Sequence, residues 1–167
     1  MPTLPMKMTN SSWLIITGFA LLVACSDDDA GGDGGGNGSQ DDPYATQRQA
    51  CVNRINAFRA TLDLPPLQRW TAEERCVDGQ AKSDSQTGDA HGAFGDCHER
   101  AQNECPGWRS IDQTIQDCLQ DMWDEGPGEP FSEHGHFLNM SNPDHTQVAC
   151  GFYETPDGEV WAIQNFR

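Results

Sequence analysis

The first regular pattern of apolar and polar positions along the chain predicts a helix. Cys51, Ile55, Phe58 and Leu62 are three or four positions apart, and most residues between them are polar. This spacing is typical of an amphipathic helix, whose apolar side chains share one face. The helix is expected to end at residues 63–66 (Asp-Leu-Pro-Pro), because two consecutive prolines do not continue a helix.

Two capping sequences predict the next two helices. Residues 71–74 (Thr-Ala-Glu-Glu) and residues 110–113 (Ser-Ile-Asp-Gln) each place a hydroxyl at the cap and a Glu or Gln three positions later. Such a pair satisfies free backbone amides at a helix start. We therefore expect a second helix from Thr71 toward Ser85, and a third, amphipathic helix from Ser110 to Glu125, where Gly-Pro-Gly stops it.

The stretch from Ser132 to Tyr153 changes its pattern partway along. It begins with a polar, histidine-rich segment that we interpret as a loop, and it continues with the alternation typical of a half-buried strand. Strands are expected at residues 147–153 and 159–165, and the Pro-Asp-Gly between them favours a hairpin. A loop that leads into a strand is a common way to mount a site on a rigid support.

The order of these elements predicts the fold class. Three main helices precede a terminal hairpin, and any other strand is hidden in the irregular middle of the chain. Helices and strands separated in this way are typical of the α+β class, whereas alternating elements would favour βαβ units. We therefore predict an α+β domain with a small antiparallel sheet that ends in the C-terminal hairpin.

The N-terminal segment has the pattern of a bacterial lipoprotein signal. Residues 13–24 are almost wholly apolar but too few to span a bilayer comfortably, and they end in Leu-Val-Ala before Cys25, which resembles a lipobox. We expect residues 1–24 to be a signal peptide and an acylated Cys25 to anchor the protein in a membrane. The alternative is an ordinary secretory signal with an accidental cysteine.

The composition after the signal predicts a tether and then one domain. Residues 26–42 contain only Ser, Asp, Gly, Asn, Ala and Gln, which cannot bury enough apolar surface to offset the entropy of ordering. We expect residues 25–43 to be a flexible tether and residues 44–167 to be one folded domain. This domain would lie in the bacterial cell envelope, outside the cytoplasm, facing the periplasm or at the cell surface.

The charge of the chain excludes one class of partner. The formal net charge is -16 and becomes -17 when the segment that holds Lys7 is removed. Because phosphate binding requires a basic surface, we expect no nucleic acid as a partner.

The cysteine count predicts disulfides. Of seven cysteines, six remain beside Cys25, and an even number after a secretion signal favours three disulfides in an oxidising compartment. The six are Cys51, Cys76, Cys97, Cys105, Cys118 and Cys150. We expect Cys97 to pair with Cys105, because their separation closes a short loop, and leave the other pairings open. A zinc knot is disfavoured, since no C-x-x-C pair occurs.

The histidines raise the question of a metal site. His134 and His136 are two positions apart, so they would share a face on an extended strand, and neutral imidazoles with a carboxylate can form an open zinc site. The alternative is that a surface loop holds histidines without a metal role, above all at His98, His134 and His145.

Taken together, these features resemble the CAP superfamily of cysteine-rich secretory proteins, antigen 5 and pathogenesis-related proteins. The chain has a helix, Leu-Pro-Pro-Leu, a Trp, a helix, a His after it, a helix that ends in Trp-Asp-Glu, then Gly-His and a Cys-Gly strand. The resemblance covers about residues 50–166. It implies an α-β-α sandwich with a cleft lined by two His and two acidic residues.

The resemblance also implies particular site residues. Gly135 and His136, with Asn-Pro six and seven positions after the His, resemble the second-His motif of the family, and His91 resembles the first His. Glu125 resembles the acid on the third helix. A divalent metal such as Zn²⁺ would then bind at His91, Glu125 and His136.

The chain departs from the family pattern at one corner of the implied cleft. Ala-Gln-Asn matches the spacing of the Gly-Glu-Asn motif of the family but puts Gln102 where the acid should be, and an amide is neither a proton acceptor nor a carboxylate ligand. Glu104 supplies the acid only if the backbone differs. We expect Gln102, Glu104, Trp108 and His134 to contact a ligand.

Two functions of different classes follow from this interpretation. The first is a binding module whose cleft takes a divalent metal or a small ligand such as a lipid, peptide or glycan. The second is a metal-dependent hydrolase of peptide or cell-wall substrates. Six paired cysteines would leave no thiol nucleophile, and no Gly-x-Ser-x-Gly motif is present. A structural or adhesive surface protein, which would tolerate loss of every histidine, is a third class.

Overall fold

The structure is a computed structural model that describes residues 42–167. The predicted signal peptide, the anchor at Cys25 and most of the tether lie outside the described residues. The elements, in chain order, are α1 (Ala45–Ala60), β1 (Gln68–Arg69), α2 (Glu74–Thr87), β2 (Ala101–Trp108), α3 (Ile111–Gln113), the π-helical turn η1 (Thr114–Cys118), α4 (Leu119–Asp124), α5 (Phe131–Ser141), β3 (Gln147–Glu154) and β4 (Val160–Phe166). Among these residues, no helix has both the length and the apolar character that a membrane span requires.

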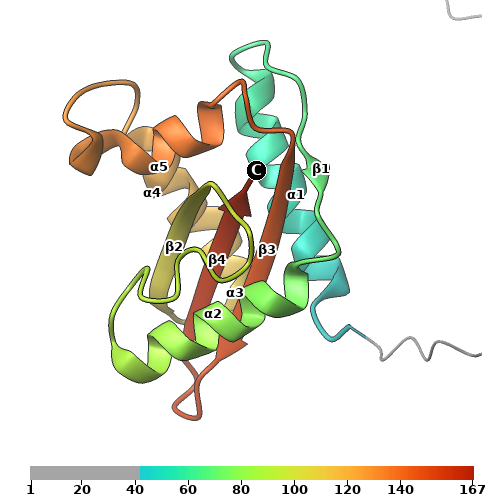
Figure 1. The fold of residues 1–167 in the computed structure, drawn as a ribbon, viewed down its shortest axis with the longest axis vertical. Helices are drawn as coiled ribbons and strands as arrows, with labels where there is room; N and C mark the ends of the chain where they lie inside the picture. Colours follow the sequence, from blue (N-terminus) through green and yellow to red (C-terminus); the bar gives the residue numbers. More distant parts are fainter. Residues whose placement is uncertain (1–41) are drawn as a thin grey trace, which may run out of the picture. The chain divides into compact units, whose positions relative to one another are not determined.

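The strands form one mixed sheet in the order β1-β3-β4-β2 (Figure 1). β3 and β4 pair antiparallel and are the predicted hairpin, while β2 pairs antiparallel with β4. The short β1 pairs parallel with β3. β2 is the strand that the irregular middle of the chain concealed, and it brings that segment to the edge of the sheet.

Helices cover both faces of the sheet. α2 lies on one face, and α1 with the α3–η1–α4 helix lies on the other (Figure 1). One apolar core therefore contains Ile55, Leu119 and Phe152, whereas a second core, under α2, contains Val77 and Ile163. The predicted α+β class and the α-β-α sandwich are confirmed.

Alternate side chains of β3 point to opposite faces of the sheet, and both faces are buried. The prediction of a half-buried strand was wrong, because residues 148–152 are buried on both sides of the sheet. Gly151 shows how closely α2 approaches, since a Cβ at this position would lie 2.5 Å from the backbone carbon of Val77. Only glycine leaves this space.

The second capping sequence forms as predicted and the first does not. The Ser110 hydroxyl accepts a hydrogen bond from the backbone N–H of Gln113 at 3.1 Å, as a capping serine should. Thr71 caps nothing, because α2 begins three residues later, at Glu74. The Glu74 carboxylate instead forms an ion pair with Arg69, so the first residue of α2 is engaged in a tertiary contact.

The histidine-rich stretch is a helix, which corrects the predicted loop. α5 buries Phe137 and Met140, and its other positions are exposed or half-buried. His134 and His136 therefore do not share a face as they would on a strand, because two residues of an α-helix are rotated by about 200°. Phe137 and Met140 are three positions apart, a helical spacing that the sequence analysis did not recognise among the histidines of the polar side.

The structure contains three disulfides, as expected, but the predicted Cys97–Cys105 pair was wrong. Cys76 pairs with Cys97 and Cys105 pairs with Cys118, and the third bond joins the two remaining cysteines, Cys51 and Cys150. Cys97 lies in the core under α2, whereas Cys105 lies in the core on the opposite face of the sheet. The sheet separates the two sulfurs that sequence distance had suggested to be neighbours.

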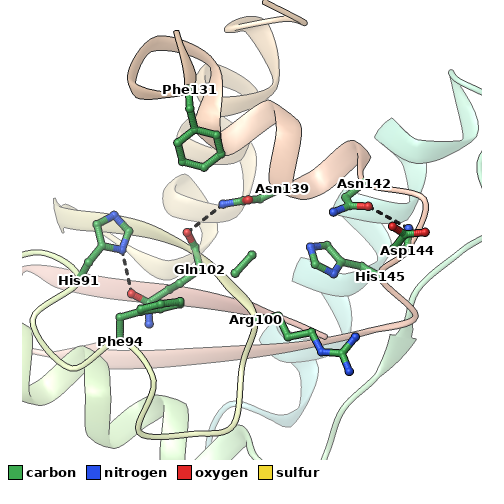
Figure 2. A pocket seen from close by; sticks show the side chains of 10 residues that line it. His91, Phe94, Arg100, Gln102, Phe131, Asn139, Asn142, Asp144 and His145 are labelled. Atoms are coloured by element: carbon green, nitrogen blue, oxygen red, sulfur yellow. Dashed lines mark hydrogen bonds between the residues drawn. The ribbon is translucent and has the colours of Figure 1, made fainter. Parts of the chain in front are cut away.

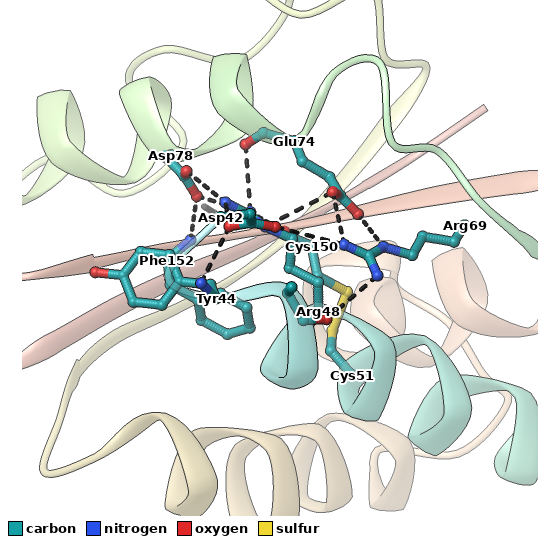
Figure 3. Close-up of polar contacts among 10 residues, drawn as sticks. Asp42, Tyr44, Arg48, Cys51, Arg69, Glu74, Asp78, Cys150 and Phe152 are labelled. Carbon is teal, nitrogen blue, oxygen red and sulfur yellow. Dashed lines mark hydrogen bonds and ion pairs between the residues drawn. A yellow bond between two sulfur atoms is a disulfide. The ribbon is translucent and has the colours of Figure 1, made fainter. Parts of the chain in front are cut away.

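A buried arginine joins the start of the described chain to both layers (Figure 3). Arg48 is 1% exposed and donates to both oxygens of Asp78 at 2.9 and 2.7 Å, to Asp42 at 2.9 Å and to the carbonyl of Cys150 at 2.7 Å. Glu74 lies 3.6 Å from the same guanidinium. Three carboxylates and a carbonyl thus offset the burial of one positive charge.

Candidate functional site

His91 is held above the edge strand by two residues of that strand. It lies in the loop after α2 with φ of 64°. Its backbone N–H donates to Glu104 Oε2 at 2.5 Å, and its Nδ1 lies 2.8 Å from Gln102 Oε1. Gln102 and Glu104 are two positions apart on β2, so they point to the same side of the sheet. The structure therefore brings together three of the predicted site residues.

The Gln102 amide belongs to a directed chain of buried amides. Its Nε2 donates to Asn165 Oδ1 at 3.1 Å, and Asn165 Nδ2 donates to Gln80 Oε1 at 2.7 Å. This order leaves Gln102 Oε1 to face His91. The oxygen is an acceptor, so the Nδ1 of His91 is the donor, and in the neutral ring the lone pair is on Nε2. A glutamate at position 102 would leave Asn165 Oδ1 without its donor, which gives a physical reason for the departure from the family motif.

Two buried carboxyl groups support the His91 loop from below. Asp84 and Glu104 are 1% and 4% exposed, and Asp84 Oδ1 accepts the backbone N–H of Ala93 at 2.9 Å. Their other oxygens have no further partner among the described residues. Burial, and next the nearby Asp84 carboxylate, raise the pKa of Glu104 to about 7, although the N–H of His91 opposes this. Burial also raises the pKa of Asp84, although the backbone N–H of Ala93 opposes this.

His136 and Glu125 form a second corner of the site. His136 lies on α5 and Glu125 at the C-terminal end of α4. The His136 Nδ1 lies 2.5 Å from Glu125 Oε1, and its backbone N–H donates to Glu125 Oε2 at 3.0 Å. The carboxylate thus orients the ring through Nδ1, and in the neutral ring the lone pair is on Nε2, the arrangement common for metal-binding histidines. The sequence analysis placed these two residues in one site, and the structure places them in direct contact.

The other two predicted ligand contacts lie elsewhere. His134 Nδ1 donates to the carbonyls of Glu125 and Gly126, at 2.8 and 3.0 Å, so its ring supports the turn after α4. Trp108 ends β2 and packs partly against the main core. Neither residue lines the groove described next.

An open groove of about 670 Å³ lies beside His91 (Figure 2). Its lining residues are His91, Phe94, Arg100, Ala101, Gln102, Phe131, Asn139, Asn142, Asp144 and His145. Phe94 and Phe131 are 49% and 58% exposed, and they are two of the three exposed large apolar residues in the described chain. The sequence analysis predicted His91 and Gln102 as site residues but not the other lining residues, because the groove forms only where residues 91–102 meet residues 131–145. The available signal was a phenylalanine in a glycine-rich loop.

The predicted metal ligands His91, Glu125 and His136 do not form a group of three close ligand atoms within the described residues. Within residues 42–167, one group of three potential ligand atoms lies within 4.8 Å, formed by Glu73, Cys76 and Cys97. Both of its sulfurs are in a disulfide, so they are not thiolate ligands. His91 and His136 do suit a metal in their chemistry, because each has an acceptor at Nδ1 and a free Nε2. Metal binding stays a prediction.

The arrangement of helices, sheet and histidines agrees with the sequence comparison. The sequence profile of the cysteine-rich secretory protein family, CAP, matches residues 52–166. The chain belongs to this family. No curated protein sequence matches the CAP protein described here at a significant level.

Solved structures with the same fold come from distant proteins. Venom allergen-like protein 4 of Schistosoma mansoni is 13% identical, with a TM-score of 0.54 over 72% of this CAP chain and 86% of its own. An outer surface protein of Borrelia burgdorferi is 14% identical, with a TM-score of 0.56 over 74% and 92%. NaASP2 in a structure with Zn²⁺ is 12% identical, with a TM-score of 0.51 over 73% and 79%. At these identities the likeness shows the fold alone.

The disulfides bear on the compartment of the CAP protein. Three disulfides staple α1 to β3, α2 to the following loop, and β2 to the π-helical turn. Such bonds persist in oxidising compartments outside the cytoplasm. Together with the family, they indicate an extracytoplasmic protein.

Proposed function

We propose that this CAP protein is a lipid-anchored, extracytoplasmic binding module whose cleft takes a small ligand or a divalent metal. The observation that carries the proposal is the groove beside His91, which combines exposed phenylalanines with the amides of Gln102, Asn139 and Asn142. Ligand sites are concave, mostly apolar and supplied with a few placed polar groups. The exposed rings of Phe94 and Phe131 would contribute most to the binding free energy, because such a ligand removes their apolar surface from water.

The two histidines support the metal part of the proposal. Gln102 and Glu125 each accept the Nδ1 proton of one imidazole, so His91 and His136 would coordinate through Nε2. A bound zinc ion would supply Lewis-acid chemistry. The solved structure of NaASP2 with Zn²⁺ supports the same metal for this fold.

The first test is a zinc titration by calorimetry on the full chain purified in a mild detergent. Wild type is compared with His91→Ala and His136→Ala, and circular dichroism checks each fold. We expect zinc to bind to wild type and each substitution to weaken it at least about tenfold, since each removes one ligand. His98→Ala is the matched control, because its ring is exposed, lies 3.5 Å from Glu73 and does not line the groove. If wild type binds no zinc and no peptide, lipid or glycan in a screen, the proposal fails.

A metal-dependent hydrolase is the second candidate. The Glu125–His136 pair favours it, because a carboxylate that orients an imidazole is an acid-base pair. Turnover of a peptide or cell-wall substrate that stops on chelation and returns with zinc would support this function. Binding without turnover would support the module alone.

The anchor has a separate test. Cys25→Ala should move the protein from the membrane fraction to the soluble fraction, because one acylated cysteine provides the predicted attachment. Retention of Cys25→Ala in membranes would contradict the lipoprotein assignment. Cys25→Ala leaves the Cys76–Cys97 disulfide in place. The domain should therefore fold as in wild type, and this fold is checked as the internal control.

A further inference from the structure

The two ends of the groove differ in chemistry. Figure 2 shows the aromatic rings of His91, Phe94 and Phe131 gathered at one end, and Asn142, Asp144, His145 and Arg100 at the other. An apolar ligand alone would leave the second end unused. A ligand that fits both ends has an apolar part and a polar terminus.

The polar end has an excess of positive charge within an acidic protein. Arg59 is 1% exposed, and its guanidinium donates to the carbonyls of Pro65, Met140 and Asn142. Within the described residues it has no carboxylate partner, so its charge is solvated by dipoles alone. Arg100 likewise makes no ion pair with a described residue, and it is exposed at the groove.

His145 is a buried polar residue without a partner at this end. It is 7% exposed, its ring stacks on Phe166, and its Nε2 has no hydrogen-bond partner in the described structure. The ring points into the groove between Asn142 and Arg100 (Figure 2). A buried nitrogen without a partner is costly, and a ligand oxygen nearby would remove the cost.

Asn139 and Asn142 offer the groove one free acceptor and one free donor. Asn139 uses its Nδ2 on the Gln102 carbonyl and on Asn103, which leaves its Oδ1. Asn142 uses its Oδ1 on the backbone N–H of Asp144, which leaves its Nδ2. A peptide group carries the complementary donor and acceptor.

We propose that the groove binds the carboxyl-terminal end of a peptide. The terminal carboxylate lies at Arg100 and His145, the last peptide group meets Asn139 and Asn142, and the apolar side chains rest on Phe94 and Phe131. This inference rests on the proposed function and names its ligand class. Asp144 is the opposing charge on the rim, where exposure to water weakens its repulsion.

The test uses N-acetyl-Leu-Phe as the probe and its carboxyl-terminal amide as the uncharged control, in calorimetry on the full chain. We expect the amide to bind at least about tenfold more weakly, because it loses the charge-assisted bond to Arg100. Arg100→Gln should weaken the acid by a similar factor and leave the amide unchanged. Asp144→Asn should strengthen the acid a few-fold. Both positions are exposed, so neither change threatens the fold.

Three results would overturn the inference. Equal binding of acid and amide would show that no carboxylate is recognised, and tighter binding of the acid by Arg100→Gln would show that Arg100 does not hold the carboxylate. Octanoate that binds as tightly as the peptide would show that Asn139 and Asn142 recognise no peptide group. A zinc titration on the same samples separates this inference from the proposed function, since zinc binding without peptide binding refutes the inference alone.

Discussion

At the scale of single residues, the protein builds its site from groups that fix one another's protons. Gln102 sets the tautomer of His91, and Glu125 sets that of His136. The buried amides of Asn165 and Gln80 fix the orientation of the Gln102 amide, because each amide nitrogen donates to the oxygen of the next amide. Residue identity at position 102 therefore matters beyond its contact with His91.

Gln102→Glu should destabilise the fold by about 1–3 kcal/mol, because the new carboxylate faces Asn165 Oδ1 and takes away a buried donor. The measurement is the free energy of unfolding in urea at neutral pH. Gln49→Glu is the control, since Gln49 is exposed and bonds within α1 to Asn53. An unchanged unfolding energy for Gln102→Glu would show that the amide chain is not maintained in solution.

Glu104→Gln should flatten the pH dependence of stability. The pKa of Glu104 is raised in the fold from 4.5 to about 7. Its stabilising contribution is therefore complete below about pH 4.5 and is lost as the pH rises through about 7, by about 3 kcal/mol in total. Unfolding energies at pH 5 and pH 8 test this. Wild type should lose more stability over the range than Glu104→Gln, while Glu129→Gln, at an exposed position, should follow wild type.

At the scale of elements, close contact between α2 and the sheet sets what each glycine tolerates. A Cβ at Gly151 of β3 would come within 2.5 Å of the Val77 backbone, whereas a Cβ at Gly79 of α2 would meet nothing within 4 Å. Backbone cannot move aside as a flexible side chain can. Gly151 thus reports on the interface between α2 and β3, whereas Gly79 lies on the open side of the same helix.

Gly151→Ala should destabilise the protein by about 2 kcal/mol or more, because the new methyl forces α2 away from β3. Gly79→Ala should stabilise it by about 0.5–1 kcal/mol, since alanine is the better helix residue and the position is open. Thermal unfolding of both variants beside wild type measures the difference. Equal effects would contradict the packing of α2 described above.

At the scale of the whole molecule, Arg48 joins the start of the folded chain to both layers of the sandwich. It contacts Asp42 before α1, Asp78 on α2 and the carbonyl of Cys150 on β3 (Figure 3). The Cys51–Cys150 disulfide links the same helix and strand covalently. The contact between α1 and β3 is therefore stabilised both by the hydrogen bonds and ion pairs of Arg48 and by the disulfide.

Arg48→Ala should cost about 3 kcal/mol, because it leaves three carboxylates near one another without their shared cation. Chemical denaturation measures the loss, and limited proteolysis near Asp42 should become faster as the chain start is released. Arg109→Ala, at an exposed position, should change stability by less than about 0.5 kcal/mol. Unchanged resistance to proteolysis in Arg48→Ala would show that the Cys51–Cys150 disulfide alone holds the start of the folded chain in place.

The sequence by itself determined the elements whose signals are local, and the tertiary structure decided which of them meet. The spacing of Ile55 and Phe58, the cap at Ser110 and the terminal hairpin depend on neighbours along the chain, so the sequence analysis predicted them. The pairing of Cys105 with Cys118 depends on which face of the sheet each sulfur occupies, and α5 is stable because Phe137 and Met140 are buried by other elements. The groove likewise joins residues 91–102 with residues 131–145, since burial and charge act through space.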